Sequence, residues 1–193
     1  MLPAVRALWP ARHYGSGLAG ILPGRAFSVW GRVFEGFFSW CYKQYLGSGF
    51  METVLFICTG NTCRSPMAEG FFRSQEGEAR TGLAAASAGL YTTGGMPASE
   101  FAVTAARERG ADISNHHSRL LNQGVLDNAK YIFCMTAAHY DHLLEQYPGV
   151  REKTYLLADE DIADPFGGDL MAYRIAADEI YEAVRIIIAK LSK

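Results

Sequence analysis

The stretch VLFICTGNTCRSP, residues 54–66, decides how this chain folds and what its site can do. Its first four residues are apolar and partly β-branched, which is typical of a buried parallel strand. The run ends in Cys58, Arg64 follows six positions later, and Ser65-Pro66 is a typical helix start. A strand, a tight loop and a helix N-terminus gather backbone N–H groups around an anion. The stretch therefore predicts a cysteine thiolate that attacks phosphorus from the base of an anion-binding loop.

Each residue type in this loop has a chemical reason. A free cysteine has a pKa of about 8.5. A helix N-terminus and a nearby arginine stabilise the thiolate, so we expect Cys58 to ionise at or below neutral pH. Arg64 can hold two oxygens of a phosphate, and Ser65 can donate a hydrogen bond to the sulfur. Gly60 is expected to adopt a backbone angle that other residues resist, while Asn61 can tolerate left-handed geometry and brace the loop.

Residues 159–169, DEDIADPFGGD, offer the second group that this chemistry needs. When a thiolate attacks phosphorus, the leaving group departs as an anion unless a carboxylic acid protonates it. Asp164-Pro165, followed by Phe166 and two glycines, is a rigid turn that can present one carboxylate into a cleft. A solvated acidic loop is the alternative that composition alone equally allows.

Two separated motifs together resemble the low-molecular-weight phosphotyrosine phosphatases. They are CTGNTCRSPMAE at residues 58–69 and DPFGG at residues 164–168, in the order that the family shows. The resemblance implies that Cys58 is the nucleophile and that Arg64 is the phosphate clamp. It implies that Asp164 is the general acid while the cysteine is phosphorylated, and then the general base for hydrolysis of the phosphocysteine by water.

The resemblance also assigns the residues around these three. It makes Ser65 a helper of the thiolate and places Asn61 in a polar network with Ser87 and His116. Without the resemblance, His116 would be interpreted as a surface histidine, because His117 is beside it. The implied phosphate-binding residues are Thr59, Gly60, Asn61, Thr62, Cys63, Arg64 and Ser65.

Thr62, Phe166 and Gly167 are the residues expected to set substrate specificity. Many tyrosine-specific members carry a bulky aliphatic residue in place of Thr62 and a second aromatic residue in place of Gly167. The bacterial protein-arginine phosphatases of the same fold are similar to this chain at these positions. Phosphotyrosine needs apolar walls around its ring, whereas phosphoarginine presents N–H donors that a threonine hydroxyl and a nearby aspartate can accept. The sequence therefore predicts a protein-arginine phosphatase, with a tyrosine phosphatase as the alternative.

Cys63 suggests redox protection of the nucleophile. It lies five positions after Cys58 in the same loop, and the chain has only four cysteines. A neighbouring thiol can trap a sulfenic acid as a disulfide and prevent over-oxidation. Related phosphatases with both cysteines are known for this. The alternative is that Cys63 is a small packing residue.

Two other functions are compatible with parts of this sequence. Thiol-dependent arsenate reductases share the fold and the loop, but they relay a disulfide through two further downstream cysteines. Only Cys134 lies downstream here, in a predicted buried strand. A non-catalytic phosphopeptide-binding module would be expected to lose the nucleophile or the acid, whereas Cys58 and Asp164 are both present. We expect no cofactor and no metal, because the sequence shows no metal-ligand cluster.

The alternation of apolar runs with helical periodicity favours a parallel sheet covered on both faces, which is an α/β fold. The resemblance implies a three-layer sandwich of the flavodoxin-like type, with a four-stranded parallel sheet in the order 2-1-3-4. Ligands then bind beyond the carboxyl ends of the strands, where Cys58 lies. The expected strands are 54–57, 83–87, 131–135 and 153–157, and the expected helices are 66–76, 98–109, 139–146 and 170–190.

Residues 1–50 differ from the rest of the chain. They hold all three tryptophans and carry a net charge of +4, whereas residues 51–193 carry −6. We expect residues 51–193 to form the phosphatase domain. Residues 1–50 are expected to be a disordered extension or not native, with Met51 as the natural start. A transit peptide and a segment lying in a membrane interface are the alternatives, so membrane contact is expected only through residues 1–50.

The charge of the predicted domain also bears on its partners. A net charge of −6 over residues 51–193 argues against nonspecific binding of nucleic acid. The expected partners are phosphorylated proteins, and the expected location is the cytoplasm.

Overall fold

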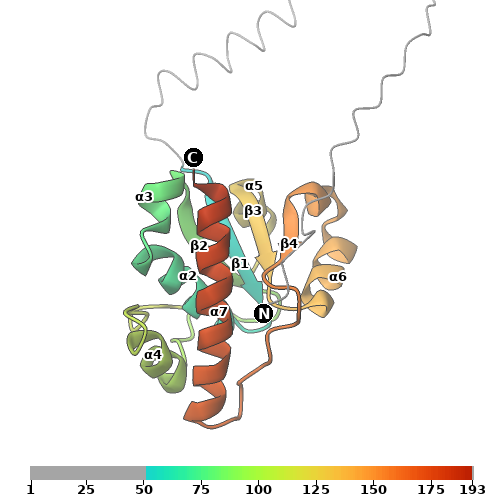
Figure 1. Ribbon diagram of the computed structural model, residues 1–193. Coiled ribbons are helices and arrows are strands. Elements are labelled where there is room, and N and C mark those ends of the chain that lie inside the picture. Colours follow the sequence, from blue (N-terminus) through green and yellow to red (C-terminus); the bar gives the residue numbers. More distant parts are fainter. Residues whose placement is uncertain (1–50, 193) are drawn as a thin grey trace, which may run out of the picture. The chain divides into compact units, whose positions relative to one another are not determined.

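The computed structural model describes residues 51–192, and the expectations for residues 1–50 lie outside the described residues. Four parallel strands form one sheet in the order β2-β1-β3-β4 (Figure 1), which confirms the predicted order. The central strand β1 is buried along its whole length, as its apolar run predicts. The strands are β1 Thr53–Cys58, β2 Ala84–Gly89, β3 Ala129–Cys134 and β4 Thr154–Leu156.

Alternate residues of β1 supply two separate cores, one on each face of the sheet. The main covering helices are α2 Arg64–Ser74, α4 Glu100–Arg107, α5 Gln123–Asp127, α6 Ala137–Gln146 and α7 Leu170–Leu191. Val54 and Phe56 pack with α2 and α7, and Leu55 and Ile57 pack with α5 and α6. In Figure 1, α7 crosses in front of the sheet with α2 beside it. These three layers confirm the predicted sandwich.

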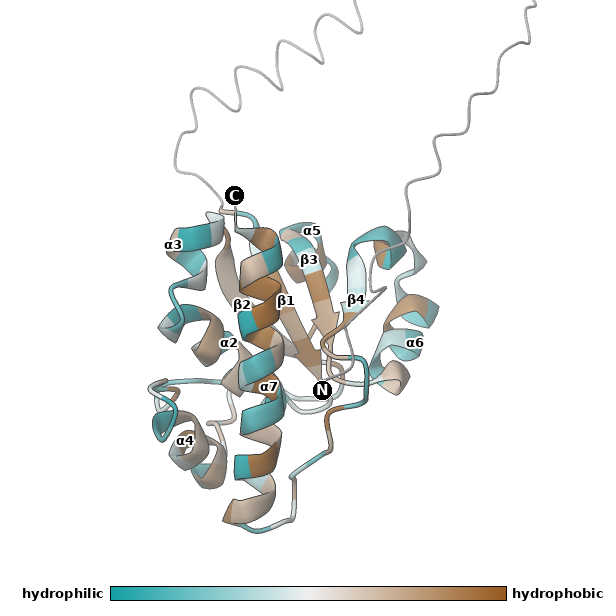
Figure 2. Ribbon diagram, in the orientation of Figure 1, coloured by the Kyte–Doolittle hydropathy of each residue, from teal (hydrophilic) through white to brown (hydrophobic). Residues whose placement is uncertain are grey.

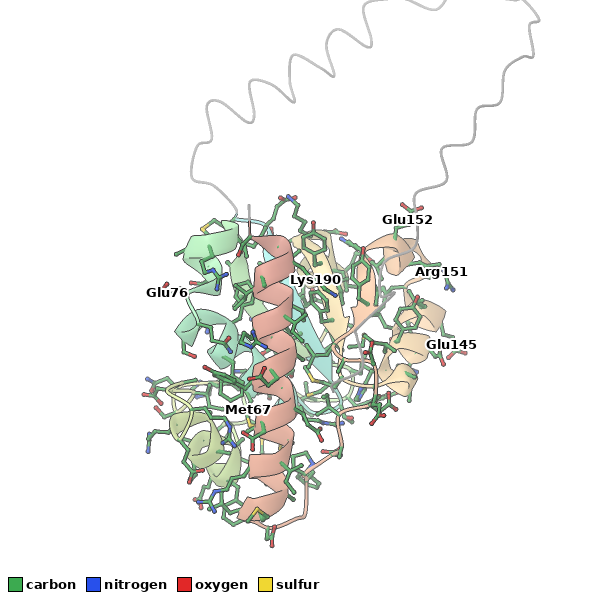
Figure 3. All side chains as sticks on the ribbon, viewed as in Figure 1. Met67, Glu76, Glu145, Arg151, Glu152 and Lys190 are labelled. Atoms are coloured by element: carbon green, nitrogen blue, oxygen red, sulfur yellow. The ribbon has the colours of Figure 1, made fainter. Side chains whose placement is uncertain are left out.

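The outside of this layered structure is charged and its interior is apolar. Figure 2 shows hydrophobic residues on β1 and β3 and in bands along α7. Figure 3 shows Glu76, Glu145 and Arg151 pointing outward at the periphery, whereas Met67 of α2 is fully buried. None of the helices described in residues 51–192 is long and apolar enough to cross a membrane.

The structure differs from the prediction at helix ends and in short helices. Helix α4 is shorter at both ends than predicted, and it begins after Ser99, whose Oγ accepts a hydrogen bond from Ala102 N–H at 3.3 Å. Helix α6 begins earlier than predicted, because Thr136 Oγ1 caps it by accepting the N–H of His139 at 3.2 Å. The helices that the sequence did not predict are too short to show periodicity. They are α3 Gly77–Thr81, α5 and the 3₁₀ helix η1 Pro148–Lys153.

The ends of β1 and β2 lie against each other where the site forms. A side chain at Gly89, the last residue of β2, would place its Cβ 2.8 Å from Thr59 O and 3.1 Å from Asn61 Cβ. Only glycine therefore lets the chain after β1 fold back against β2.

Candidate active site

Residues 58–65, which we call the nucleophile loop, curl so that their carbonyl groups point outward. Five of these carbonyls accept hydrogen bonds at 2.9–3.3 Å. The donors are Leu90 N–H to residue 58, Tyr91 N–H to residue 59, His116 Nε2 to residue 61, Ser99 N–H to residue 62 and Met67 N–H to residue 63. A peptide C=O and N–H point to opposite sides of the chain, so the N–H groups are left to face inward. Asn61 N–H points at Cys58 Sγ, at 3.3 Å. The loop is thus shaped to surround an anion beside the sulfur.

The left-handed residue of the loop is Asn61 rather than Gly60. Asn61 has a φ of 56° and is fully buried, in agreement with its predicted geometry. The prediction for Gly60 is wrong, because its φ lies outside the left-handed region and a Cβ there would meet only Thr62 Oγ1, at 3.6 Å. The sharp turn of the loop is therefore made by asparagine, which can hold this geometry through its side-chain hydrogen bonds.

The side-chain amide of Asn61 has all its hydrogen bonds inside the protein. Its Nδ2 donates to Ser65 Oγ at 2.9 Å and to Ser87 Oγ at 2.8 Å, and its Oδ1 accepts Arg119 N–H at 2.8 Å. The Ser87 hydroxyl donates in turn to the buried carboxylate of Glu69. A fully satisfied buried network of this kind holds the loop in one conformation.

His116 supports the same asparagine from the other side. Its Nε2 lies 2.9 Å from the backbone oxygen of Asn61. A carbonyl oxygen can only accept, so Nε2 carries the hydrogen. Partial burial lowers the pKa of His116, which favours the neutral ring. The structure therefore brings Ser87 and His116 to Asn61, where the family resemblance placed them.

The Cys58 thiol is buried and contacts the hydroxyl of Ser65. The distance between Sγ and Oγ is 2.9 Å. Asn61 Nδ2 donates to Ser65 Oγ, and the Ser65 hydroxyl keeps its own hydrogen, which it can donate to a thiolate on Cys58. Ser65 can thus stabilise a thiolate on Cys58.

Burial raises the pKa of the Cys58 thiol above its ordinary value. Hydrogen bonds from Ser65 and Asn61 and the charge of Arg64 act in the opposite direction, but in this conformation burial is the larger effect. The direction is opposite to the lowering of the Cys58 pKa that the sequence predicts. Two features of the fold account for the difference: the thiol is completely buried, and Arg64 is paired with the Asp164 carboxylate.

Arg64 contacts the loop of residues 159–169, which we call the acidic loop. The guanidinium is buried, its Nη1 donates to Ile162 O at 3.0 Å, and its Nη2 lies 2.7 Å from Asp164 Oδ2. Asp164 is half exposed, and its Oδ1 accepts the N–H of Phe166 at 3.2 Å. Asp164 thus lies at the site and not in a free, solvated loop. These two contacts use two of the five N–H donors of the guanidinium, so donors remain for a phosphate.

The two cysteines of the nucleophile loop have different surroundings. Cys63 is buried, with its Sγ 3.4 Å from Tyr173 Oη and 3.5 Å from Ser99 Oγ. Thr62, which is half-buried, has its Oγ1 3.6 Å from Cys63 Sγ. Cys58 and Cys63 are both free thiols.

The specificity residues of the acidic loop lie at the surface. The side chain of Phe166 is 77% exposed. Gly167 has a φ of 81°, in the left-handed region that favours glycine. A residue with a side chain at this position would be strained. The acidic loop therefore presents one exposed aromatic ring, and the position after it carries no side chain.

Several contacts at the site were missed in the sequence analysis. Glu69 had a usable signal in the sequence, because it is a charged residue among the apolar and small residues of the run MAEGFF at 67–72. Tyr173 contacts Cys63 across 110 residues of sequence, and His139 contacts Thr59 across 80, so no local pattern could reveal them. Among residues 51–192, no group of three or more His, Cys, Asp or Glu is placed to hold a metal ion.

This geometry agrees with a known family. The family model for low molecular weight phosphotyrosine protein phosphatase matches residues 53–193. The chain belongs to this family, and its chemistry is that of a cysteine-dependent phosphatase.

Relatives of both substrate types are similar to the chain. The protein-arginine-phosphatase of Geobacillus stearothermophilus is 38% identical over 144 residues, which are 72% of this chain and 95% of the relative. The solved YwlE arginine phosphatase from Geobacillus stearothermophilus has 36% identity and a TM-score of 0.68, covering 72% of this chain and 92% of that one. A low molecular weight protein tyrosine phosphatase from T. tengcongensis has 37% identity and a TM-score of 0.68, covering 72% and 98%. Overall similarity thus leaves the substrate to be argued from the site.

Proposed function

We propose that this protein is a protein-arginine phosphatase, which hydrolyses phosphoarginine on phosphorylated proteins through a phosphocysteine intermediate. The observation that carries the proposal is Thr62, which puts a half-buried hydroxyl in the nucleophile loop where an aliphatic wall would favour a tyrosine ring. The Geobacillus stearothermophilus relative named protein-arginine-phosphatase supports the proposal.

The Asp164 carboxylate supplies the second acceptor for a substrate guanidinium. It already contacts one guanidinium, that of Arg64, at 2.7 Å, and it is half exposed on its other side. A carboxylate matches the planar donor fork of an arginine side chain. Because the Asp164 side chain is half exposed, it can accept donors of the substrate guanidinium while Arg64 holds the phosphoryl group.

The first step transfers the phosphoryl group to sulfur. The Cys58 thiolate donates an electron pair to phosphorus, an S–P bond forms, and the P–N bond of phosphoarginine breaks. The bonding pair leaves with nitrogen, which takes a proton from the Asp164 carboxyl. Arg64 and the inward N–H groups of the loop stabilise the phosphoryl oxygens throughout.

The second step regenerates the enzyme. Asp164, now a carboxylate, takes a proton from a water molecule while the water oxygen attacks phosphorus. The S–P bond breaks, inorganic phosphate leaves, and the electron pair returns to Cys58 as a thiolate. Ser65 Oγ, 2.9 Å from the sulfur, stabilises that leaving thiolate by hydrogen bonding.

Thr62→Ile tests the choice of substrate. The wild-type protein should prefer a phosphoarginine peptide over a matched phosphotyrosine peptide. The variant should shift the ratio of the two kcat/KM values towards phosphotyrosine by at least tenfold, because isoleucine cannot accept hydrogen bonds from the guanidinium donors. Thr62→Ser, which keeps the hydroxyl, is the matched control and should retain the preference. A wild-type preference for phosphotyrosine would establish the tyrosine phosphatase instead.

We also propose that Cys63 protects the nucleophile from over-oxidation. A sulfenic acid on Cys58 would be attacked by the Cys63 thiolate, forming a disulfide and releasing hydroxide. Cys63 would first have to leave its contacts with Tyr173 and Ser99. After peroxide treatment, wild-type activity should recover with dithiothreitol, whereas Cys63→Ser should recover less than about half of it. Full recovery of the variant would contradict this role.

The proposed setting follows from this chemistry. We propose that the substrates are phosphorylated proteins, since the nucleophile loop and the acidic loop meet at the carboxyl end of β1, where Asp164 is half exposed and Phe166 is exposed. We propose a cytoplasmic location, because a reducing compartment keeps Cys58, Cys63 and Cys134 as the free thiols that they are here.

A further inference from the structure

The segment between β3 and α6 lies between the nucleophile loop and the acidic loop. Met135 N–H donates to Ile57 O, next to the nucleophile, at 3.1 Å, and the Met135 carbonyl accepts Ile162 N–H at 3.0 Å. Ala137 N–H, in the first turn of α6, donates to the Asp161 carboxylate at 2.7 Å. This segment is therefore bonded both to the strand that carries Cys58 and to the loop that carries Asp164.

His139 completes this connection on the side of the nucleophile. Its Nε2 lies 2.8 Å from Thr59 Oγ1, and its Nδ1 lies 2.7 Å from Thr136 Oγ1. The ring is buried, whereas Thr59, directly after the nucleophile, is exposed. Among the described residues, the bond to His139 is the hydrogen bond that the structure shows between the Thr59 side chain and α6.

The protonation state of His139 suits two hydroxyl partners. Burial and, to a lesser degree, the nearby charge of Arg64 lower the pKa of His139 to about 4, so the ring is neutral at neutral pH. A neutral imidazole has one donor and one acceptor nitrogen, and a threonine hydroxyl can serve as either partner. The chain Thr136–His139–Thr59 is thus satisfied without any charge.

We infer that His139 is a positioning residue. Through Thr59, it fixes the nucleophile loop relative to the acidic loop. It thereby determines how Asp164 is positioned relative to the leaving group on phosphorus. Its side chain contacts the two threonines and need not touch the substrate. A displacement of about 1 Å between reacting groups can slow a reaction on the order of 10²-fold. The inference rests on the phosphatase activity proposed above, whichever amino acid carries the phosphate.

A pair of substitutions separates the two ring nitrogens. In His139→Asn, the amide reaches the place of Nδ1 and keeps Thr136, but it is too short for Thr59. In His139→Gln, the amide reaches the place of Nε2 and keeps Thr59. We expect His139→Asn to lower kcat/KM on phenyl phosphate, a poor leaving group that needs the acid, by about 10- to 100-fold. On p-nitrophenyl phosphate, a good leaving group, the loss should be less than about threefold, and His139→Gln should stay near wild type on both.

Three further variants make the test decisive. Thr59→Val removes the hydroxyl at an exposed position and should reproduce the loss of His139→Asn, and the double variant should be no worse than either single one. His142→Asn, on the same helix but paired with Tyr91, is the matched control and should leave both rates unchanged. Equal losses on the two substrates, equal losses in the Asn and Gln variants, or multiplying effects in the double variant would overturn the inference. Wild-type turnover of p-nitrophenyl phosphate tests the proposed function separately from these ratios.

Discussion

Replacing Cys58 with serine is expected to reduce turnover of phosphoarginine and aryl phosphates by on the order of 10⁴-fold or more. A serine hydroxyl in this buried loop has no base beside it to remove its proton, whereas the thiol can ionise with the help of Ser65 and Arg64. The folded state should be little changed, because serine can keep the contact with Ser65. Initial rates measure the loss of turnover, and a thermal unfolding curve on the same preparation measures whether the fold is retained.

Cys134→Ala is the matched control for that loss. Cys134 is also buried at the end of a strand, and burial raises the pKa of its thiol to about 12. The hydrogen bonds and the arginine charge that favour a thiolate on Cys58 do not act on Cys134, so it is no nucleophile at neutral pH. The substitution should cost about 1 kcal/mol of unfolding free energy and leave turnover unchanged. If Cys134→Ala also lost activity, and arsenate were reduced by the wild-type protein, the thiol-relay alternative would have to replace the phosphatase.

The parts of the site that could be predicted from the sequence are those encoded locally. Residues 54–66 contain a strand, a loop and a helix start in one continuous run, so β1, the nucleophile loop and α2 follow from burial and helix-start preferences. The residue type of Asn61 likewise indicated that it can tolerate the left-handed geometry that it adopts. Asp164 needed the family resemblance, since composition could not separate it from a solvated loop.

The parts that could not be predicted depend on contacts between distant segments. The pKa direction of Cys58 was wrong because it depends on complete burial and on where Arg64 points, and both are set by the fold. The unusual backbone angle expected at Gly60 is not found there. The glycine that the nucleophile loop requires is Gly89, on a different strand, because a side chain there would collide with the loop. His139 belongs to the first turn of α6, and nothing in its own neighbourhood in the sequence shows that α6 begins beside the nucleophile loop.

Asp164→Asn is expected to lower kcat/KM on phenyl phosphate by about 10²- to 10⁴-fold, and much less on p-nitrophenyl phosphate. Asparagine has nearly the shape of aspartate but no proton to give to the leaving group, so the loss should grow as the leaving group becomes poorer. kcat/KM is the informative constant, because it reports the steps up to departure of the leaving group. Asp161→Asn, in the same acidic loop and with its oxygen still available to Ala137 N–H, should lose less than about threefold.

The same substitution has an effect on Cys58 that requires no turnover. Asp164 lies 2.7 Å from Arg64 and offsets its positive charge, and Arg64 is one of the groups that lower the pKa of the Cys58 thiol. Removing the carboxylate leaves the guanidinium charge uncompensated, which favours the thiolate and shifts the pKa of Cys58 downward. The rate of Cys58 alkylation by iodoacetamide, measured against pH, should therefore rise at lower pH in Asp164→Asn than in the wild type. An unchanged or upward-shifted profile would show that Arg64 does not transmit the charge of Asp164 to the nucleophile, and that the contact between the clamp and the acid matters only for leaving-group protonation.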